Sequence, residues 1–540
     1  MRRPWILRVV GALLFVLAAA GVATRTAFAH AGLESSTPSA NSVLEEAPAE
    51  IVLDFDEAIE AALSSITLFD SDGQAVELGS PSSGDDDTIV KVAVPAIGDG
   101  IYAVVWRVTS ADGHVVDGAF SFQVGTATAG DAKELLDLVR NGARSDPAVR
   151  WWYGVARFLS LAGAIVLLGT SGWVVFGPAG LTDRRGPRRV AFIAWVALLV
   201  GSAFAFALFG AEAVAGSLGD MFATSHWGDV VNTQTGRMLA LRAVLAVVLG
   251  VLLAFRRYTE RGWWREAGFL AGMCTLYTFS ASGHPSVTEP AAWWIALDLV
   301  HMTAIVVWIG GLLALAVAGS AQLAEPEGEQ MVRRFSLAAS ICVPLIVVTG
   351  AAQALRLAGG LDDITATDWG RLLLTKVTVV AALLAVAGVS RWLLHHDGPA
   401  SVRRTVIAEF VLGMVVVAMA AGMVALPPEP AVQSRPFAEQ LSSNGLIAIV
   451  SLSPGSVGGN EVHITMTPPG GSITPVVSAT ARVSLPAADI PLSPVTLVKE
   501  GPNHYSGSIT FPRSGDWTFE VIVQITDTQE VLLTTTVPIP

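Results

Sequence analysis

Cysteine is almost absent from this sequence of 540 residues, which holds only two, Cys274 and Cys342. Both lie inside apolar stretches, so we expect neither a disulfide framework nor a CxxC metal site. Charged residues are also scarce. Asp, Glu, Lys and Arg make up 15% of the chain, whereas soluble proteins average about 25%. A purely soluble, disordered or collagen-like protein is therefore excluded, and a relay of thiolate ligands for a metal is not supported.

Positive charge is the scarcer sign, and the formal net charge is −13 at pH 7. Residues 30–150 contain 21 Asp and Glu against 6 Lys and Arg, a larger surplus than that of the whole chain. A nucleic-acid partner needs a basic surface and is not expected. Cations suit an acidic surface, although such a surface also simply keeps a domain soluble. The chain has no Walker A motif, so we do not expect ATP to drive it.

Apolar stretches of about 20 residues, the length that crosses a hydrocarbon core of about 30 Å, recur along the middle of the chain. We predict eight membrane spans, at residues 151–178, 188–211, 235–255, 266–283, 292–320, 333–356, 371–392 and 402–425. The loops after the odd-numbered spans are rich in arginine, and the loops after the second, fourth and sixth spans hold no Lys or Arg. The positive-inside rule then predicts both ends of the bundle outside a bacterial plasma membrane.

The N-terminus agrees with this topology. Arg2, Arg3 and Arg8 precede an apolar run over residues 9–22, and Ala27-Phe28-Ala29 follows as an A-x-A cleavage site. This pattern is typical of a secretory signal peptide, here residues 1–29. Cleavage would leave His30 as the first residue of the mature chain, and an uncleaved anchor is the alternative.

Two polar regions flank the apolar one. Both contain short alternating strands separated by turns rich in Pro, Gly, Asp and Ser, a pattern typical of β-sandwiches. The sequence therefore predicts a multi-domain membrane protein with an N-terminal Ig-like β-sandwich, an eight-helix transmembrane bundle and a C-terminal β-sandwich. The expected boundaries are 30–127 for the first sandwich, 128–150 for a linker, 151–426 for the bundle, 427–444 for a second linker and 445–540 for the second sandwich.

His30, Asp112 and His114 form the first group of candidate ligands. An N-terminal histidine offers its α-amine and its imidazole to one ion. Asp112 and His114 stand two residues apart, so they face the same side of an extended strand. Three nitrogens and one oxygen suit Cu(II), which heads the Irving–Williams order and favours tetragonal N,O geometry. By spacing alone the signal is weak, because an Asp-x-His also arises by chance.

The residues around this group carry a resemblance. The stretch from Tyr102 to Phe122, and the opening His30-Ala31-x-Leu33-x-x-Ser36-x-Pro38, resemble the CopC family of periplasmic copper-binding proteins. The resemblance covers about residues 30–125 and implies that His30, Asp112 and His114 bind Cu(II). Some members of that family also carry a methionine-rich Cu(I) site. This chain has no Met between Met1 and Met221, so we do not expect that second site.

A second group of candidates lies in or near the spans. Asp298, His301 and Met302 fall in the fifth span. Asp298 and His301 share one helical face, where the carboxylate could orient the imidazole. Ionisable residues in membrane helices usually face a cavity or a partner. His284 and His226, in the loops outside, would extend a copper path from the surface to mid-membrane. Packing between helices is the alternative role.

Three further stretches carry resemblances. The run from His301 to Leu312, with Trp308 and Gly310-Gly311, and the run from Trp369 to Lys376 resemble the CopD copper-transport family. That resemblance spans about residues 150–425 and implies inward passage of Cu(I) or Cu(II), with His301 as a candidate site residue. The run from Gly515 to Val521 resembles YtkA-like domains. In that last domain His463 and His504 have no evident partner motif, so we expect them to be surface or core residues.

Together these patterns resemble a fused CopC/CopD copper resistance and transport protein. We predict that it captures Cu(II) on its extracytoplasmic domain and passes copper to the bundle for import and homeostasis. Copper ion, the lipid bilayer and an extracytoplasmic copper donor are the expected partners, and no catalytic activity is expected. The alternatives are a sequestration or sensing protein that moves no copper, a histidine-brace copper oxidase, which Asp112 disfavours, and a haem or quinone bundle.

Overall fold

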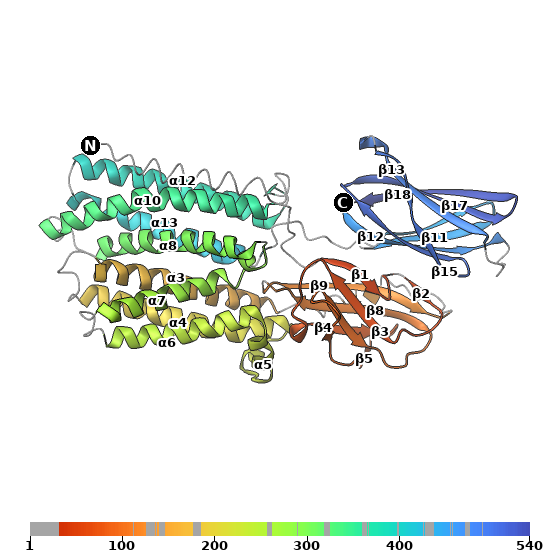
Figure 1. Ribbon diagram of the computed structural model, residues 1–540, viewed down its shortest axis with the longest axis horizontal. Helices are drawn as coiled ribbons and strands as arrows, with labels where there is room; N and C mark the ends of the chain where they lie inside the picture. The colour runs from red at the N-terminus through yellow and green to blue at the C-terminus, as the bar shows by residue number, and fades with distance from the viewer. Residues whose placement is uncertain are drawn as a thin grey trace.

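The computed structural model describes residues 32–125 except 41 and 112, parts of 135–139, residues 146–176, 185–255, 262–317 except 289, 325–358, 364–365, 367–396, 399–424, 426 and 437–539 with gaps at 454, 456, 470–475 and 489. The predicted signal peptide lies outside these residues. So do two of the candidate copper ligands, His30 and Asp112. A helical body occupies one end of the molecule and two β domains occupy the other (Figure 1).

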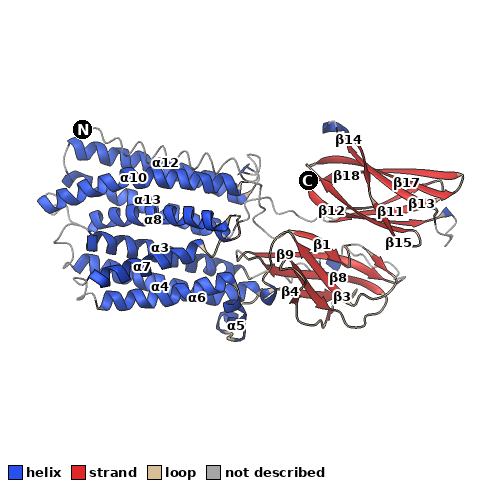
Figure 2. Cartoon of the chain, viewed as in Figure 1, coloured by secondary structure: helices blue, strands red, loops and turns tan. Residues whose placement is uncertain are grey.

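The N-terminal domain consists of two sheets (Figure 2). The first has the order β1-β3-β7-β6, with β1 (Leu33–Thr37), β3 (Glu50–Phe55), β7 (Ile89–Ala93) and β6 (Ser82–Ser83). The second has the order β2-β9-β8-β4-β5, with β2 (Val43–Leu44), β9 (Val115–Val124), β8 (Gly100–Thr109), β4 (Ser65–Phe69) and β5 (Ala75–Val76). In β3, Ile51, Leu53 and Phe55 are buried between less buried neighbours, the period of two expected of a strand with one face on a core. The predicted β-sandwich is confirmed.

Eight long helices correspond to the eight predicted spans. They are α3 (Pro147–Phe176), α4 (Arg185–Ala213), α6 (Gln234–Ala254), α7 (Gly262–Ser280), α8 (Ala291–Val317), α10 (Pro326–Leu357), α12 (Asp368–His396) and α13 (Arg403–Met423). Seven of them are long and apolar enough to cross a membrane, and α7 is not among the seven. α7 has 19 residues and begins with Gly-Trp-Trp-Arg-Glu, and tryptophan is enriched at the membrane interface. It nevertheless packs against α6 and α8 within the bundle.

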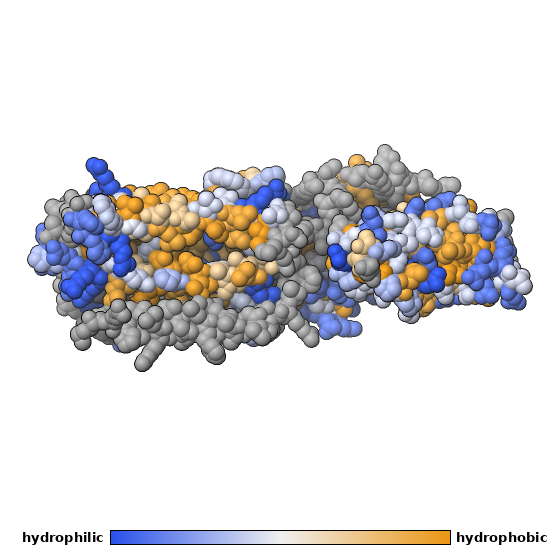
Figure 3. Space-filling model, turned by 90° about the horizontal axis from the view of Figure 1, so that it is seen from above, coloured by the Kyte–Doolittle hydropathy of each residue, from blue (hydrophilic) through white to orange (hydrophobic). Residues whose placement is uncertain are grey.

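Helix α8 is the centre of the bundle. Of the 18 residues that form its apolar stretch, 61% are buried inside the protein, whereas only 6% of the corresponding stretch of α12 are buried. Small residues permit its closest contact: a Cβ added to Gly310 would lie 2.3 Å from the Cα of Gly169 on α3, so these two helices meet backbone to backbone. Apolar side chains cover the flank of the helical body, as the orange band in Figure 3 shows. That band is the surface expected to face lipid.

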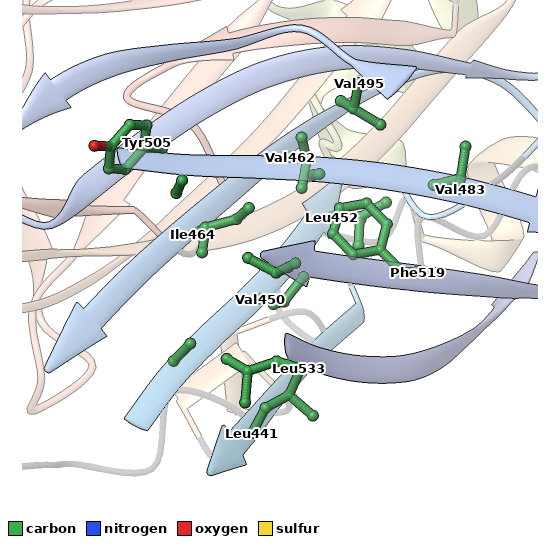
Figure 4. Packing of buried hydrophobic residues seen from close by; sticks show 14 of the residues in the cluster. Leu441, Val450, Leu452, Val462, Ile464, Val483, Val495, Tyr505, Phe519 and Leu533 are labelled. Carbon is green, nitrogen blue, oxygen red and sulfur yellow. The ribbon is translucent and has the colours of Figure 1, made fainter. Parts of the chain in front are cut away.

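The C-terminal domain is a second pair of sheets. One has the order β10-β11-β12-β16-β15, with β10 (Phe437–Ser443), β11 (Leu446–Ser453), β12 (Gly458–Thr467), β16 (His504–Phe511) and β15 (Leu497–Gly501). The other has the order β14-β13-β17-β18, with β14 (Ile490–Val495), β13 (Ser478–Leu485), β17 (Gly515–Thr526) and β18 (Gln529–Ile539). Alternate residues of both sheets, among them Val450, Val462 and Phe519, fill one core (Figure 4). The predicted C-terminal β-rich region is confirmed.

Candidate metal centre

His114 stands at the turn that joins β8 to β9. The Ser110 amide donates to the His114 carbonyl at 2.8 Å and closes the turn. Gly113 has φ +87°, a left-handed conformation that residues with a Cβ rarely adopt. A Cβ at Gly113 would also lie 2.5 Å from the side-chain oxygen of Thr235, in the first turn of α6. The turn that carries Gly113 and His114 therefore rests directly on the membrane bundle.

The His114 side chain contacts two further segments of the bundle. Its Nε2 lies 2.6 Å from the carbonyl oxygen of Val424, just beyond α13. Because a carbonyl only accepts, Nε2 donates, and in the neutral ring Nδ1 then holds the lone pair. The ring also stacks on the imidazole of His284, with centroids 4.7 Å apart and planes 5° from parallel. Thus a predicted copper ligand lies against a predicted residue of the membrane path.

Buried polar contacts fasten the N-terminal domain in this position. Arg107, on β8, is 4% exposed and donates from Nε to the Ala213 carbonyl at 3.1 Å and from Nη2 to the Glu212 carbonyl at 2.7 Å. These carbonyls end α4, where a helix has no partners of its own for its last carbonyls. Burial lowers the pKa of Arg107, while the negative charge of Asp117 acts in the opposite direction. The guanidinium thus joins the domain to the end of α4.

The start of α6 holds a second polar contact. The backbone N–H of Gln234, in the first turn of α6, donates to Oε1 of Glu60 at 2.9 Å. A carboxylate is favoured there because a helix N-terminus carries partial positive charge. Burial raises the pKa of Glu60, and the Gln234 amide partly offsets this rise. Leu63 packs beside this contact in one buried cluster with Leu208 and Phe209 of α4. The docking surface is therefore both polar and apolar.

These contacts bring together the chain segments that the arginine pattern placed outside the membrane. The end of α4, the start of α6, the loop with His284 and the end of α13 all touch the N-terminal domain. They share one end of the bundle (Figure 1). The alternation of the loops and the position of the N-terminal domain thus agree with a single topology.

Deeper in the bundle, the hydrogen bonds of Asp298 and His301 run to different partners. Asp298, on α8, accepts from the Ser280 hydroxyl at 2.6 Å and from Nε2 of Gln353 at 3.2 Å. Nδ1 of His301 lies 2.7 Å from the Thr349 hydroxyl on α10. The expectation that Asp298 orients His301 is therefore wrong: sharing a helical face did not bring the two side chains into one hydrogen bond, because α7 and α10 supply closer partners.

Thr349 fixes the proton on His301. Its hydroxyl donates to the Leu345 carbonyl at 2.6 Å, so towards His301 it acts as acceptor. Nδ1 of His301 then carries the proton and Nε2 holds the lone pair, the arrangement in which an imidazole can bind a metal. A Cβ at Gly350 would lie 3.2 Å from Cε1 of His301. Sequence reasoning did not assign a role to Thr349, although Thr349-Gly350 directly follows an apolar run.

The two remaining candidates for the copper path are Met302 and His226. Met302 is buried in the apolar core of the bundle, among residues such as Val306 and Leu276. His226 lies on the short helix α5 (Ser225–Asn232), which packs against α4 and α6. Among the described residues, no group of three or more His, Cys, Asp and Glu side chains is arranged to hold a metal ion. His30 and Asp112 are outside that set, so the predicted site of His30, Asp112 and His114 stays a prediction.

Known family models match most of the N-terminal and membrane regions, but not residues 293–328, which include nearly all of α8. Residues 33–125 match the CopC domain, residues 146–292 the N-terminal domain of copper resistance protein D-like proteins, and residues 329–423 copper resistance protein D. The matches follow the domain order that the sequence and the fold both show.

Individual relatives agree. The copper transport protein CutJ of Bacillus subtilis (strain 168) is 27% identical over 459 residues, or 82% of this chain and 83% of CutJ. Copper resistance protein C of Xanthomonas campestris pv. juglandis is 35% identical over 117 residues, or 20% of this chain and 91% of that protein. The crystal structure of CopC from Methylosinus trichosporium OB3b is 31% identical and covers 19% of this chain and 99% of that chain, with a TM-score of 0.18.

Proposed function

We propose a function from one premise: this chain belongs to the CopC family and carries the domains of copper resistance protein D in the same polypeptide. It is a copper-binding, multi-pass membrane protein of copper transport and resistance. Our proposal concerns the finer steps. The N-terminal domain captures Cu(II) from an extracytoplasmic donor through His30, Asp112 and His114, and the bundle carries copper inward across the plasma membrane.

The observation that carries the proposal is the stacking of His114 on His284. His284 belongs to the short helix η4 (His284–Ser286), in the loop between α7 and α8. A copper ion held by His114 is therefore one imidazole away from the bundle, and transfer requires no separation of the domains. A protein that only sequesters copper would have no need to place its ligand against the membrane domain.

The next polar groups inward lie beyond this loop. Ser280 ends α7 four residues before His284, and its hydroxyl donates to Asp298. His301 follows one turn further along α8, with its Nε2 lone pair available to an ion. We propose the order His284, Asp298, His301, with Met302 and His226 as flanking residues. Nitrogen and oxygen ligands of this kind accept Cu(II), and imidazole also binds Cu(I).

Catalysis is not part of this proposal. An oxidase built on His30 and His114 needs an open coordination position for oxygen, and a carboxylate from Asp112 would fill it. A sensing or sequestration role remains the second candidate, and it predicts copper on the N-terminal domain with no change inside the cell. Oxygen consumption with ascorbate and bound copper tests the oxidase directly, and measurable turnover would contradict our proposal.

Cytosolic copper measures the function. Cells grown at limiting copper would express the intact chain, His284→Ala, His301→Ala, His396→Ala or no protein, and elemental mass spectrometry would quantify copper in the cytosol. We expect the intact chain and His396→Ala to raise cytosolic copper, because His396 is an exposed residue at the end of α12. His284→Ala and His301→Ala should lose most of this increase. Equal cytosolic copper in all cells would exclude import.

A further inference from the structure

Two histidines of the C-terminal domain form a pair that sequence reasoning missed. His463 lies on β12 and His504 begins β16, and Nδ1 of the first is 3.1 Å from Nε2 of the second. The register pairs His463 with Ser506 and Thr465 with His504, so the two histidines are diagonal neighbours on one face of the sheet. The sequence showed no partner motif for either residue, and the structure makes them partners of each other. Their separation of 41 residues hides the contact from any local pattern.

A carboxylate lies beside the far nitrogen of His463. Oε1 of Glu461 lies 3.3 Å from Nε2 of His463. A carboxylate oxygen only accepts, so it favours the proton on Nε2 and leaves the lone pair of His463 on Nδ1, the nitrogen that faces His504. Histidines that bind metals characteristically have such a carboxylate on the far nitrogen, because it fixes the ring and raises its basicity.

The pair lies at the seam between the two β domains. Val462 and Ile464, the neighbours of His463 on β12, point into the core of the C-terminal domain. His463 therefore points away from that core, yet it is 8% exposed. β12 contacts β1 of the N-terminal domain (Figure 1), and the Ser39 side chain hydrogen-bonds Glu461. This contact explains how a histidine on the outer face of a sheet is buried.

The distance between the two nitrogens is compatible with a shared cation. Metal–imidazole bonds of about 2.0–2.1 Å place two ligand nitrogens about 2.9–3.4 Å apart at angles between 90° and tetrahedral. The observed 3.1 Å falls in this range. In the metal-free pair, the same distance is spanned by an N–H···N hydrogen bond. A cation can take the place of that proton if the His504 proton moves to the other ring nitrogen.

We propose that His463 and His504 form a second copper site, with Glu461 as the positioning residue and water completing the coordination. Two imidazoles favour divalent first-row transition-metal ions, and the Irving–Williams order ranks Cu(II) first among them. The site uses none of His30, Asp112 and His114. It therefore stands or falls independently of the import function.

Copper stoichiometry tests the site. The full chain in detergent, in a His30→Ala/His114→Gln background, would be loaded with Cu(II) alone, desalted and analysed for copper per chain. We expect His504→Gln and His463→Gln each to lower the copper content by one per chain. They should also remove the nitrogen couplings of that copper from the electron paramagnetic resonance spectrum. His396→Gln, at the far end of α12, serves as the matched control and should change neither measurement.

His504→Gln carries the test if His463→Gln fails to fold, because His504 is the more exposed of the two. If His504→Gln keeps the copper content and the spectrum of its background, the pair is a structural hydrogen bond and the proposal is overturned. Glu461→Gln separates positioning from folding. It should weaken Cu(II) about tenfold in a competition titration with a chelator, with little change in the unfolding temperature of the metal-free chain.

Discussion

The two β domains of this protein are similar in architecture and different in attachment. The N-terminal sandwich is seated on one end of the bundle by the hydrogen bonds that Arg107 donates and that Glu60 accepts. The C-terminal sandwich meets the N-terminal one through β12 and β1. In both cases a histidine lies at the contact, His114 in the first and His463 in the second. The two copper sites that we propose thus both lie where two domains meet.

The largest effect should come from the bonds that seat the N-terminal domain. Arg107→Ala removes the donors for the Glu212 and Ala213 carbonyls at the end of α4. Hydrogen bonds of a charged group contribute about 1.5–3 kcal/mol, so we expect a loss of about 2–3 kcal/mol in the stability of the docked domain. Thermal unfolding and limited proteolysis of the full chain in detergent would measure it.

The C-terminal domain supplies the control. Arg482 pairs with Glu520 at 2.8 Å, and the Arg482 side chain is 41% exposed. Exposed ion pairs contribute about 1 kcal/mol or less, so Arg482→Ala should cost clearly less than Arg107→Ala. Equal costs would mean that Arg107 contributes no more than a surface residue and that the docking we describe is held by other contacts.

A smaller effect is expected from the turn that carries His114. Gly113→Ala places a Cβ in a left-handed conformation and against Thr235. The conformational part alone costs about 1–2 kcal/mol. We expect lower domain stability and slower copper transfer, measured by unfolding and by cytosolic copper. Gly98→Ala is the matched control, because a Cβ there meets nothing within 4 Å. An unchanged Gly113→Ala protein would show that the turn does not rest on α6.

The smallest effect concerns pH and the N-terminal domain alone. Burial raises the pKa of Asp56 from 3.8 to about 6, although the Gly32 amide donates to it. A raised pKa in the folded state favours the protonated form. The contribution of the protonated Asp56 carboxyl to the stability of the fold is therefore complete below pH 3.8 and is lost as the pH rises through about 6.

Asp56→Asn should therefore gain stability relative to the unchanged chain between pH 4 and pH 7. The gain expected is about 1–2 kcal/mol, since each pKa unit corresponds to about 1.4 kcal/mol and the carboxyl is partly exposed to solvent. Unfolding temperatures across this range would measure it. Parallel curves for the two proteins would show that Asp56 titrates alike in the folded and unfolded chain.

Much of the architecture followed from local patterns. Alternation predicted the strands, apolar length predicted the bundle, and the arginine distribution predicted which loops share an end. Contacts between distant segments did not follow. The stacking of His114 on His284 joins residues 170 positions apart, and neither neighbourhood hints at the other. For Asp298, helical spacing suggested a partner on its own helix, but packing brought Ser280 and Gln353 closer.

The hydrogen bond from His114 to Val424 has a thermodynamic consequence. The same imidazole is a predicted copper ligand and the hydrogen-bond donor to a carbonyl at the end of a membrane helix. If copper changes the orientation of that ring, the strength of its hydrogen bond to Val424 changes, and so does the free energy of the present position of α13. By linkage the relation is reciprocal. Each conformation of the bundle then has its own affinity for copper at the surface, and a shift of α13 can retain or release the ion without an external signal.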